Sequence, residues 1–415
     1  MYLPPIFAPL RARNFRFFFI GQAISLPGSW FSQTAIGWLV YELTRSPSML
    51  GWANFLSQVP NFLFMPLVGV MIDRINRHKL LQGTAIACLI CSLLLVAFGA
   101  YDGKSVKLLL ALCFLRGIMG ALEMPTRQSL VLPFVGDRAL LGRAIALNSM
   151  LFNLSRMVGP AMAGQMIAWF GSAVVCFYLD ALSYLPVILL LMSMRFPPHT
   201  VEPRANEDRK PVAHDFREGL RSAWKHPLAA PLLLGMGALS FFTLSYATLL
   251  PMLARTTYSG GPQLLGYMMA VSALGAVSAA LVIALRNHVR SLVHFVYAGS
   301  ALIGVALVVM SFIPALHLAL AMLYFCGMGG VLVAGSTNAL IQEIAPEALR
   351  GRFVSFFTTA FTGLMPFGGL FIGCLTDWWR MEWSLRLAGV AGLVLAWVLR
   401  SKLRSGLKVI MGDKI

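Results

Sequence analysis

The chain repeats itself over about half its length. Residues 116–143 and 325–352 align without a gap at an offset of about 209, which pairs Gly120 with Gly329 and Arg143 with Arg352. A second alignment, offset by about 215, sets residues 47–52 against residues 262–267. Related halves that carry motifs in the same order are typical of membrane transporters built from two parallel repeats, with a substrate site between them. The repeat therefore points to transport rather than to catalysis.

Composition places the chain in a membrane. Of its 415 residues, 58% are hydrophobic and 12% are charged, whereas charged residues make up about 25% of ordinary soluble domains. Apolar runs long enough to cross a bilayer, roughly 20 residues each, occur six times in each half. The sequence thus predicts an all-α membrane protein with twelve spans in two pseudo-symmetric six-helix bundles, at about 15–41, 47–72, 80–100, 106–130, 141–169, 172–194, 228–253, 263–285, 291–313, 315–340, 353–376 and 383–403.

The distribution of basic residues predicts the orientation. The chain has 33 Lys and Arg residues against 16 Asp and Glu residues. On the predicted topology, 25 of the basic residues lie on the side of the termini, six lie on the opposite side, and Arg116 and Arg156 lie inside spans. Cytoplasmic loops carry the excess of Lys and Arg, so we expect both termini in the cytoplasm. The charge then reflects topology, and we expect no nucleic-acid partner.

The connections between spans leave no room for a soluble catalytic domain. The predicted organisation is a bundle over residues 1–195, a cytoplasmic linker rich in Pro and charge over 196–226, and a second bundle over 227–415. Within the linker, Asp215–Arg221 is expected to form a surface helix. The six cysteines fall inside predicted spans without zinc-site spacing, so we expect no metal. The N-terminus shows no cleavage site typical of a signal peptide.

A basic motif follows the second span. It runs from Gly69 through Asp73 and Arg74 to Arg77 and Lys79. A small residue allows two helices to approach, and a carboxylate at the end of one helix can meet the positive N-terminus of another. The motif resembles the signature loop of the major facilitator superfamily, with Asn76 in place of the usual Gly. The equivalent turn of the second half, residues 285–290, lacks the acid, so we expect an asymmetric contact that controls conformation.

Further motifs narrow the resemblance. Arg116–Gly120 resembles the Arg-containing motif of span 4 in this superfamily, and Gly159-Pro160 resembles the span-5 motif found mainly in its exporters. Longer strings are similar to the branch that contains the enterobactin exporter, also called transmembrane secretion effectors: residues 13–22, 146–156, 218–221 and 349–352, the last ending in the candidate gating residue Arg352. The resemblance covers essentially the whole chain and implies proton-driven export of siderophores, drugs or other amphiphiles.

Polar residues inside the spans mark candidate substrate contacts. On span 1 they form one stripe at helical spacing, and on span 2 they form another: Gln22, Ser25, Ser29 and Gln33, then Asn54, Gln58 and Asn61. Tyr246 is a candidate aromatic contact on span 7. The alternative for each stripe is hydrogen bonding between helices that only holds the bundle together. For span 1 we favour a role in lining the substrate cavity, because the first helix of each three-helix unit lines the transport path in the superfamily that the chain resembles.

Charged residues inside spans include three candidates for proton coupling: Arg116, Glu123 and Asp180. Arg116, Glu123 and Arg127 share one face of span 4. Glu123 is interpreted either as a proton-exchanging acid or as one half of a permanent ion pair, and both interpretations remain open. Asp180 on span 6 is a second candidate acid. Arg156 on span 5 is expected to receive an anionic substrate or to pair with Glu123 or Asp180.

The sequence therefore predicts a secondary transporter rather than an enzyme. It contains no Gly-x-x-x-x-Gly-Lys-Ser/Thr loop for nucleotide phosphates, so no cofactor is expected and a proton gradient is the energy source. The predicted function is export of an amphiphilic small molecule across the bacterial inner membrane by alternating access, by a monomer surrounded by lipids. A lipid or lysophospholipid flippase and a nutrient importer of the same fold are the alternatives.

Overall fold

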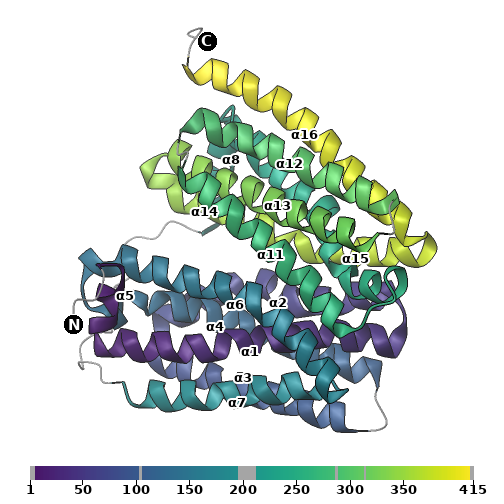
Figure 1. Ribbon diagram of the computed structural model, residues 1–415. Helices are drawn as coiled ribbons and strands as arrows, with labels where there is room; N and C mark the ends of the chain where they lie inside the picture. The colour runs from purple at the N-terminus through teal and green to yellow at the C-terminus, as the bar shows by residue number, and fades with distance from the viewer. Residues whose placement is uncertain (1–4, 102–104, 195–211, 286–287, 313–314, 412–415) are drawn as a thin grey trace. The chain divides into compact units, whose positions relative to one another are not determined.

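The computed structural model describes residues 5–101, 105–194, 212–285, 288–312 and 315–411 (Figure 1). At residues 5, 65–74, 212–216, 348 and 409–411 it describes the backbone alone. Throughout these ranges the regular structure is helical, and no strand occurs in them. The chain divides into two compact units. Unit 1 comprises residues 1–45, 56–205 and 260–270, and unit 2 comprises residues 46–55, 206–259 and 271–415.

Unit 1 is a bundle in which α7 packs against α1 and α3, α1 also packs against α6, and α3 contacts α4. Its core joins rings from distant segments, with Phe18 and Phe134 4.9 Å apart between centroids. Helix ends follow from local chemistry: the Asn76 side chain accepts two backbone N–H groups at the start of α3, and Gly171 ends α6 in a left-handed conformation. The elements are η1 (Pro5–Arg11), α1 (Arg13–Thr44), α2 (Pro47–Arg74), α3 (Arg77–Ala100), α4 (Val106–Ser129), α5 (Val131–Val135), η2 (Arg138–Leu140), α6 (Leu141–Phe170) and α7 (Val174–Met192).

Unit 2 contains the remaining helices together with residues 47–55 of α2, whereas residues 262–270 at the start of α11 belong to unit 1. The remaining helices are α8 (Val212–Lys225), α9 (Ala229–Ala238), η3 (Leu239–Thr243), η4 (Leu244–Leu249), α10 (Leu250–Met252), η5 (Leu253–Thr257), α11 (Pro262–Leu285), α12 (Val289–Phe312), α13 (Leu316–Ile344), η6 (Glu347–Leu349), α14 (Arg350–Thr358), η7 (Thr359–Gly363), α15 (Met365–Trp378) and α16 (Met381–Met411). The surface helix expected around Asp215–Arg221 is present as α8. The rest of the predicted linker, residues 196–211, lies outside the described residues.

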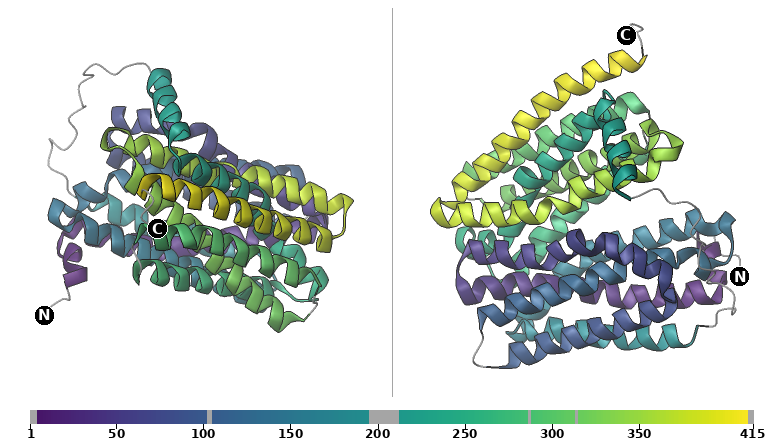
Figure 2. Two further views of the ribbon diagram at one scale, coloured as in Figure 1. Left: turned by 90° about the horizontal axis from the view of Figure 1, so that it is seen from above. Right: turned by 180° about the vertical axis from the view of Figure 1, so that it is seen from behind.

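Small residues set the close packing of α12 against α16, which lie side by side in Figures 1 and 2. A Cβ atom added at Gly304 would stand 2.8 Å from the carbonyl oxygen of Gly389, and one at Gly389 would stand 2.8 Å from the carbonyl oxygen of Gly304. Neither position has room for a side chain. The two backbones therefore touch, as small residues allow in membrane helix pairs.

Eight described helical segments are long and apolar enough to cross a membrane. They are Arg77–Ala100, Val174–Met192, Ala229–Thr257, Pro262–Leu285, Val289–Phe312, Leu316–Ile344, Arg350–Trp378 and Met381–Lys408. The other four predicted spans coincide with the long helices α1, α2, α4 and α6, which carry most of the candidate polar residues. The all-helical membrane fold is confirmed.

Two of the spans are irregular helices. The span from Ala229 to Thr257 passes from α-helix through a π turn, a 3-10 segment, a short α turn and a second π turn. The span from Arg350 to Trp378 has a π turn at Thr359–Gly363. Their counterparts in the first half are continuous helices: α1 has 32 residues and α6 has 30. The two halves therefore share the order of their helices, but two helices of the second half are less regular than their counterparts in the first.

Candidate functional site

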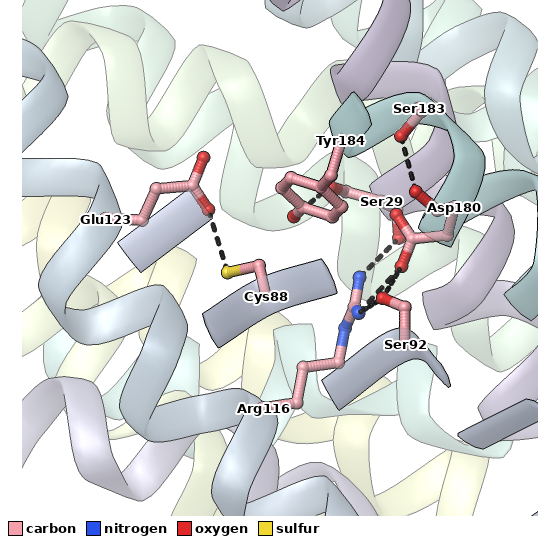
Figure 3. A network of polar contacts seen from close by, with 8 residues as sticks. All are labelled: Ser29, Cys88, Ser92, Arg116, Glu123, Asp180, Ser183 and Tyr184. Atoms are coloured by element: carbon pink, nitrogen blue, oxygen red, sulfur yellow. Dashed lines mark hydrogen bonds and ion pairs between the residues drawn. The ribbon is translucent and has the colours of Figure 1, made fainter. Parts of the chain in front are cut away.

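An ion pair joins α4 to α7 inside unit 1 (Figure 3). Nη1 of Arg116 lies 2.8 Å from Oδ2 of Asp180, whose side chain is completely buried. Ser92 of α3 donates its hydroxyl to the same oxygen at 2.8 Å, and Nη2 of Arg116 reaches the Ser29 carbonyl oxygen at 3.4 Å. The counter-ion of Arg116 is therefore Asp180 and not Glu123, the acid that shares its helix face.

The Asp180 carboxylate is satisfied on one oxygen and bare on the other. Oδ2 receives both Arg116 and Ser92, whereas Oδ1 is buried and has no hydrogen-bond partner among the described residues. Buried polar atoms in native proteins are almost always paired, so an exception calls for an explanation. A proton could add to Oδ1 without displacing either donor, which makes this oxygen a candidate acceptor.

Glu123 belongs to a second ion pair. Its Oε1 lies 3.6 Å from Nη1 of Arg127, one helical turn further along α4, and its Oε2 accepts the Cys88 thiol at 3.6 Å. The Glu123 side chain is 19% exposed. Arg127 also donates to the side-chain oxygen of Gln22 on α1. Of the two interpretations of Glu123, the contacts show an ion pair, and they leave open whether the acid also exchanges a proton.

Tyr184 lies between the two ion pairs. In Figure 3 its ring stands between Glu123 and Asp180, and its hydroxyl lies 3.4 Å from the Ser29 hydroxyl. The residue is 3% exposed and follows Asp180 by one turn of α7. Four helices thus contribute to one polar cluster in an apolar bundle. Burying charged residues inside a membrane costs free energy, and in membrane proteins such residues usually have a function.

The remaining candidates in unit 1 differ in exposure. Gln22 and Ser25 are buried, at 3% exposed each, Ser29 is half-buried and Gln33 is exposed. Gln58 and Arg156 are half-buried, and Asp180 takes Arg116 rather than Arg156 as its ion-pair partner. Gly159 and Pro160 are buried on α6, where a Cβ atom at Gly159 would stand 2.6 Å from the Cβ of Trp30 on α1. Their roles in substrate binding and gating stay predictions.

Three candidates lie in unit 2. Asn54, in the first turns of α2, donates its amide to the Thr248 hydroxyl at 3.3 Å. Tyr246 is 5% exposed in the 3-10 segment η4. Nη1 of Arg352 pairs with Oε2 of Glu218 at 2.9 Å, which ties α14 to the surface helix α8. Sequence analysis assigned Arg352 to gating without identifying this acid.

The predicted conformational motif is described only in part. Gly69, Asp73 and Arg74 fall in the stretch of α2 where the side chains are outside the description, and Arg77 begins α3. Sequence analysis also missed Ser92, Cys88 and Tyr184. The four-residue spacing of Asp180 and Tyr184 was a usable signal, but the contact of α7 with α3 and α4 is tertiary information.

Comparison with known proteins identifies the family. The family model described as transmembrane secretion effector matches residues 5–409. The chain belongs to this family. The curated relatives of the chain are transporters of the major facilitator superfamily, so the predicted resemblance is confirmed.

Curated relatives span nearly the whole chain. The Staphyloferrin A transporter of Staphylococcus aureus is 25% identical over 92% of this chain and 94% of its own length. Macrolide efflux protein A of Streptococcus pyogenes is 24% identical, covering 86% of this chain and 88% of its own. The multidrug efflux pump Tap of Mycobacterium tuberculosis is 28% identical over 84% of both chains.

Solved structures share the fold at low sequence identity. A bacterial homologue of the human lysosomal transporter Spinster aligns with a TM-score of 0.73 at 15% identity, covering 95% of this chain and 98% of its own. A bacterial homologue of the iron transporter ferroportin aligns with a TM-score of 0.71 at 15% identity, covering 94% and 98%. At this identity the likeness shows the fold alone, and it confirms the predicted fold class.

Proposed function

We propose that this chain exports an amphiphilic small molecule across the bacterial cytoplasmic membrane in exchange for protons, by alternating access with both termini in the cytoplasm. The relatives named as transporters of a siderophore, macrolides and several drugs support export of such a molecule. The observation that carries proton coupling is the buried contact of Arg116 with Asp180, one of whose oxygens lacks a partner.

The proposed coupling is a competition for Asp180 between Arg116 and a proton. In the described state the carboxylate is held by Arg116 and Ser92. A neutral carboxyl group would lose most of its attraction to the guanidinium, so protonation favours any conformation in which the two separate. Conversely, a conformation that restores the contact expels the proton. Only such a difference between conformations can couple proton release to transport.

Glu123 is the second candidate in the proposal. It is partly exposed and already contacts Arg127 in its own helix, so the contact survives any motion that moves α4 as a rigid body. A pair within one helix therefore responds less to helix rearrangement than a pair between α4 and α7. We accordingly assign the exchanged proton to Asp180 and a positioning role to Glu123.

Efflux from proteoliposomes under an imposed pH step tests the assignment. The substrate panel holds a siderophore, a macrolide, a lipophilic dye and a lysophospholipid, the last to test flippase activity. Asp180→Asn keeps the size of the side chain but cannot release a proton, so it should abolish pH-driven efflux while substrate binding persists. Glu123→Gln is the matched control and should retain pH-dependent efflux.

Two results would contradict the proposal. If Glu123→Gln loses pH-driven efflux while Asp180→Asn keeps it, the coupling acid lies on α4. If both variants respond to the pH step like the unmodified chain, neither acid carries the proton. Transport of the lysophospholipid alone would replace small-molecule export by the flippase alternative.

A further inference from the structure

A hollow of about 410 Å3 opens in unit 2 where α12 ends and α16 begins. This volume falls in the range of about 300–1,000 Å3 that is typical of small-molecule sites. The hollow lies far along α16 from the C-terminal end of that helix, and unit 1 contributes nothing to it. Its lining combines apolar residues with two arginines and one acid: Leu253, Thr257, Met310, Ser311, Phe312, Arg380, Met381, Glu382, Trp383, Leu385 and Arg386.

Arg386 lies against two aromatic rings at the wall of this hollow. Its guanidinium carbon lies 4.0 Å from the ring centroid of Phe312 and 4.5 Å from that of Trp383. Its Nε donates to the Ser311 hydroxyl at 3.3 Å. The two terminal nitrogens have no hydrogen-bond acceptor among the described residues. The two ring contacts and the Ser311 hydrogen bond hold the guanidinium in place, and they leave its two terminal nitrogens available, the edge that binds carboxylates and phosphates in a bidentate manner.

The charges of the hollow favour an anion. Arg380 contacts Glu382 at 3.4 Å between Nε and Oε2, so this acid is already engaged by one of the two arginines. Two cations and one carboxylate leave one positive charge in the lining. Because Arg386 has no acid of its own there, a bound anion would satisfy its remaining donors.

The surroundings indicate that the anion is attached to a lipid. Where α15 ends and α16 begins, Trp378, Trp379 and Trp383 are 89%, 55% and 54% exposed. Tryptophan is enriched at the depth of the lipid headgroups in membrane proteins. From Trp383 an exposed apolar stripe runs along one face of α16 at intervals of three and four residues, through Leu387, Val390, Val394 and Trp397. A soluble anion would make no contact with this apolar stripe, whereas the acyl chain of a lipid would pack along it.

We propose that this hollow is a binding site for an anionic phospholipid, whose phosphate pairs with Arg386 and whose acyl chain lies along the exposed stripe of α16. The site is separate from the ion pairs of unit 1 and goes beyond the proposed transport function. On the topology proposed above it faces the outer leaflet. Its existence depends on neither the substrate nor the coupling ion.

Native mass spectrometry of the purified full-length chain in neutral detergent tests the proposal. Phosphatidylglycerol should bind about tenfold more tightly than phosphatidylcholine of the same chain length, a difference of about 1.4 kcal/mol. Both lipids carry a phosphate, but the choline cation of phosphatidylcholine cancels that charge and is repelled by the net positive lining of the hollow. Arg386→Gln should abolish this preference. Arg400→Gln removes one charge from an exposed position nearer the C-terminal end of α16 and should leave the preference unchanged. Arg386→Lys keeps the charge without the planar fork and should give an intermediate value.

The wild-type measurement needs no variant, so misfolding of Arg386→Gln cannot hide a negative result. Equal binding of the two lipids by the wild-type chain would overturn the proposal. An equal loss in Arg386→Gln and Arg400→Gln would show general attraction of anionic lipid to a basic protein instead of a site. Displacement of phosphatidylglycerol by an equal concentration of glycerol phosphate would show a soluble-anion site. Quenching of Trp383 fluorescence by brominated phosphatidylglycerol, lost in Trp383→Phe, should place the acyl chain beside α16.

Discussion

Replacing Arg116 by Met removes the cation that faces the buried carboxylate of Asp180 and leaves Ser92 as its donor. Breaking a buried ion pair by removing one partner costs about 3–5 kcal/mol. Protonation sets an upper limit on this loss of stability, because Asp180 without its cation can become neutral by binding a proton. The free-energy cost of binding that proton falls by about 1.4 kcal/mol for each unit by which the pH is lowered.

The penalty of Arg116→Met should therefore shrink by about 2–3 kcal/mol between pH 7 and pH 5. Asp180→Leu leaves a guanidinium that cannot be deprotonated, so its penalty should not change over this range. The double variant Arg116→Met with Asp180→Leu buries no charge and should be more stable than either single variant. Thermal unfolding of the four proteins in detergent at both pH values measures the whole cycle.

Equal penalties for Arg116→Met at pH 7 and pH 5 would refute the reasoning, because the carboxylate would then be stabilised by something other than Arg116. Additivity of the two single substitutions would also refute it, since residues in direct contact must couple. The measurement does not depend on transport, so it tests the contact without a substrate.

Three further predictions follow from local contacts. Gly159→Ala should destabilise the chain by about 1–3 kcal/mol, because its new methyl group would collide with Trp30, whereas Gly142→Ala, which meets open space, should be neutral or slightly stabilising in thermal unfolding. Burial lowers the pKa of His226, whose ring nitrogen accepts the N–H groups of residues 228 and 229. The stability that the neutral ring contributes is present above about pH 6.5 and should be lost as the pH falls below that value. His226→Asn keeps an acceptor that does not titrate, so between pH 7 and pH 5 its melting temperature should fall less than that of the wild-type chain. Glu218→Gln should cost under about 1 kcal/mol, because its pair with Arg352 is exposed, and a larger loss in unfolding experiments would contradict that view.

The sequence predicted the class of fold because the repeat, the long apolar runs and the family motifs all indicate a helical membrane protein made of two similar halves. Helix positions followed from apolar length, and the starts of α4 and α13, residues 106 and 316, differ by one residue from the repeat offset of about 209. Irregular spans were not predictable, because a π turn adds one residue to a helix without changing its composition.

The sequence predicted the charged members of the candidate site, and it predicted neither their pairing nor the neutral residues Ser92, Cys88 and Tyr184. Arg116, Glu123 and Asp180 stood out because charges are costly inside a bilayer. Spacing along α4 suggested that Arg116 faces Glu123, but a helix reports only neighbours on the same helix. Asp180 reaches Arg116 because α7 packs against α3, and α3 against α4. That contact is set by how the helices assemble, which no local pattern contains.

The two π turns of the span from Ala229 to Thr257 bear on how this helix could change during evolution. A π turn is an α-helical turn with one residue inserted, and each α-helical residue turns the helix by about 100°. Loss of one residue within Leu239–Thr243 would turn this π turn into an α-helical turn, yet it would rotate every later side chain, including the buried Tyr246, away from its present neighbours. A homologue that lacks this residue should therefore carry its aromatic side chain at a shifted position, and alignments that place a gap elsewhere in the span would pair residues that face different directions.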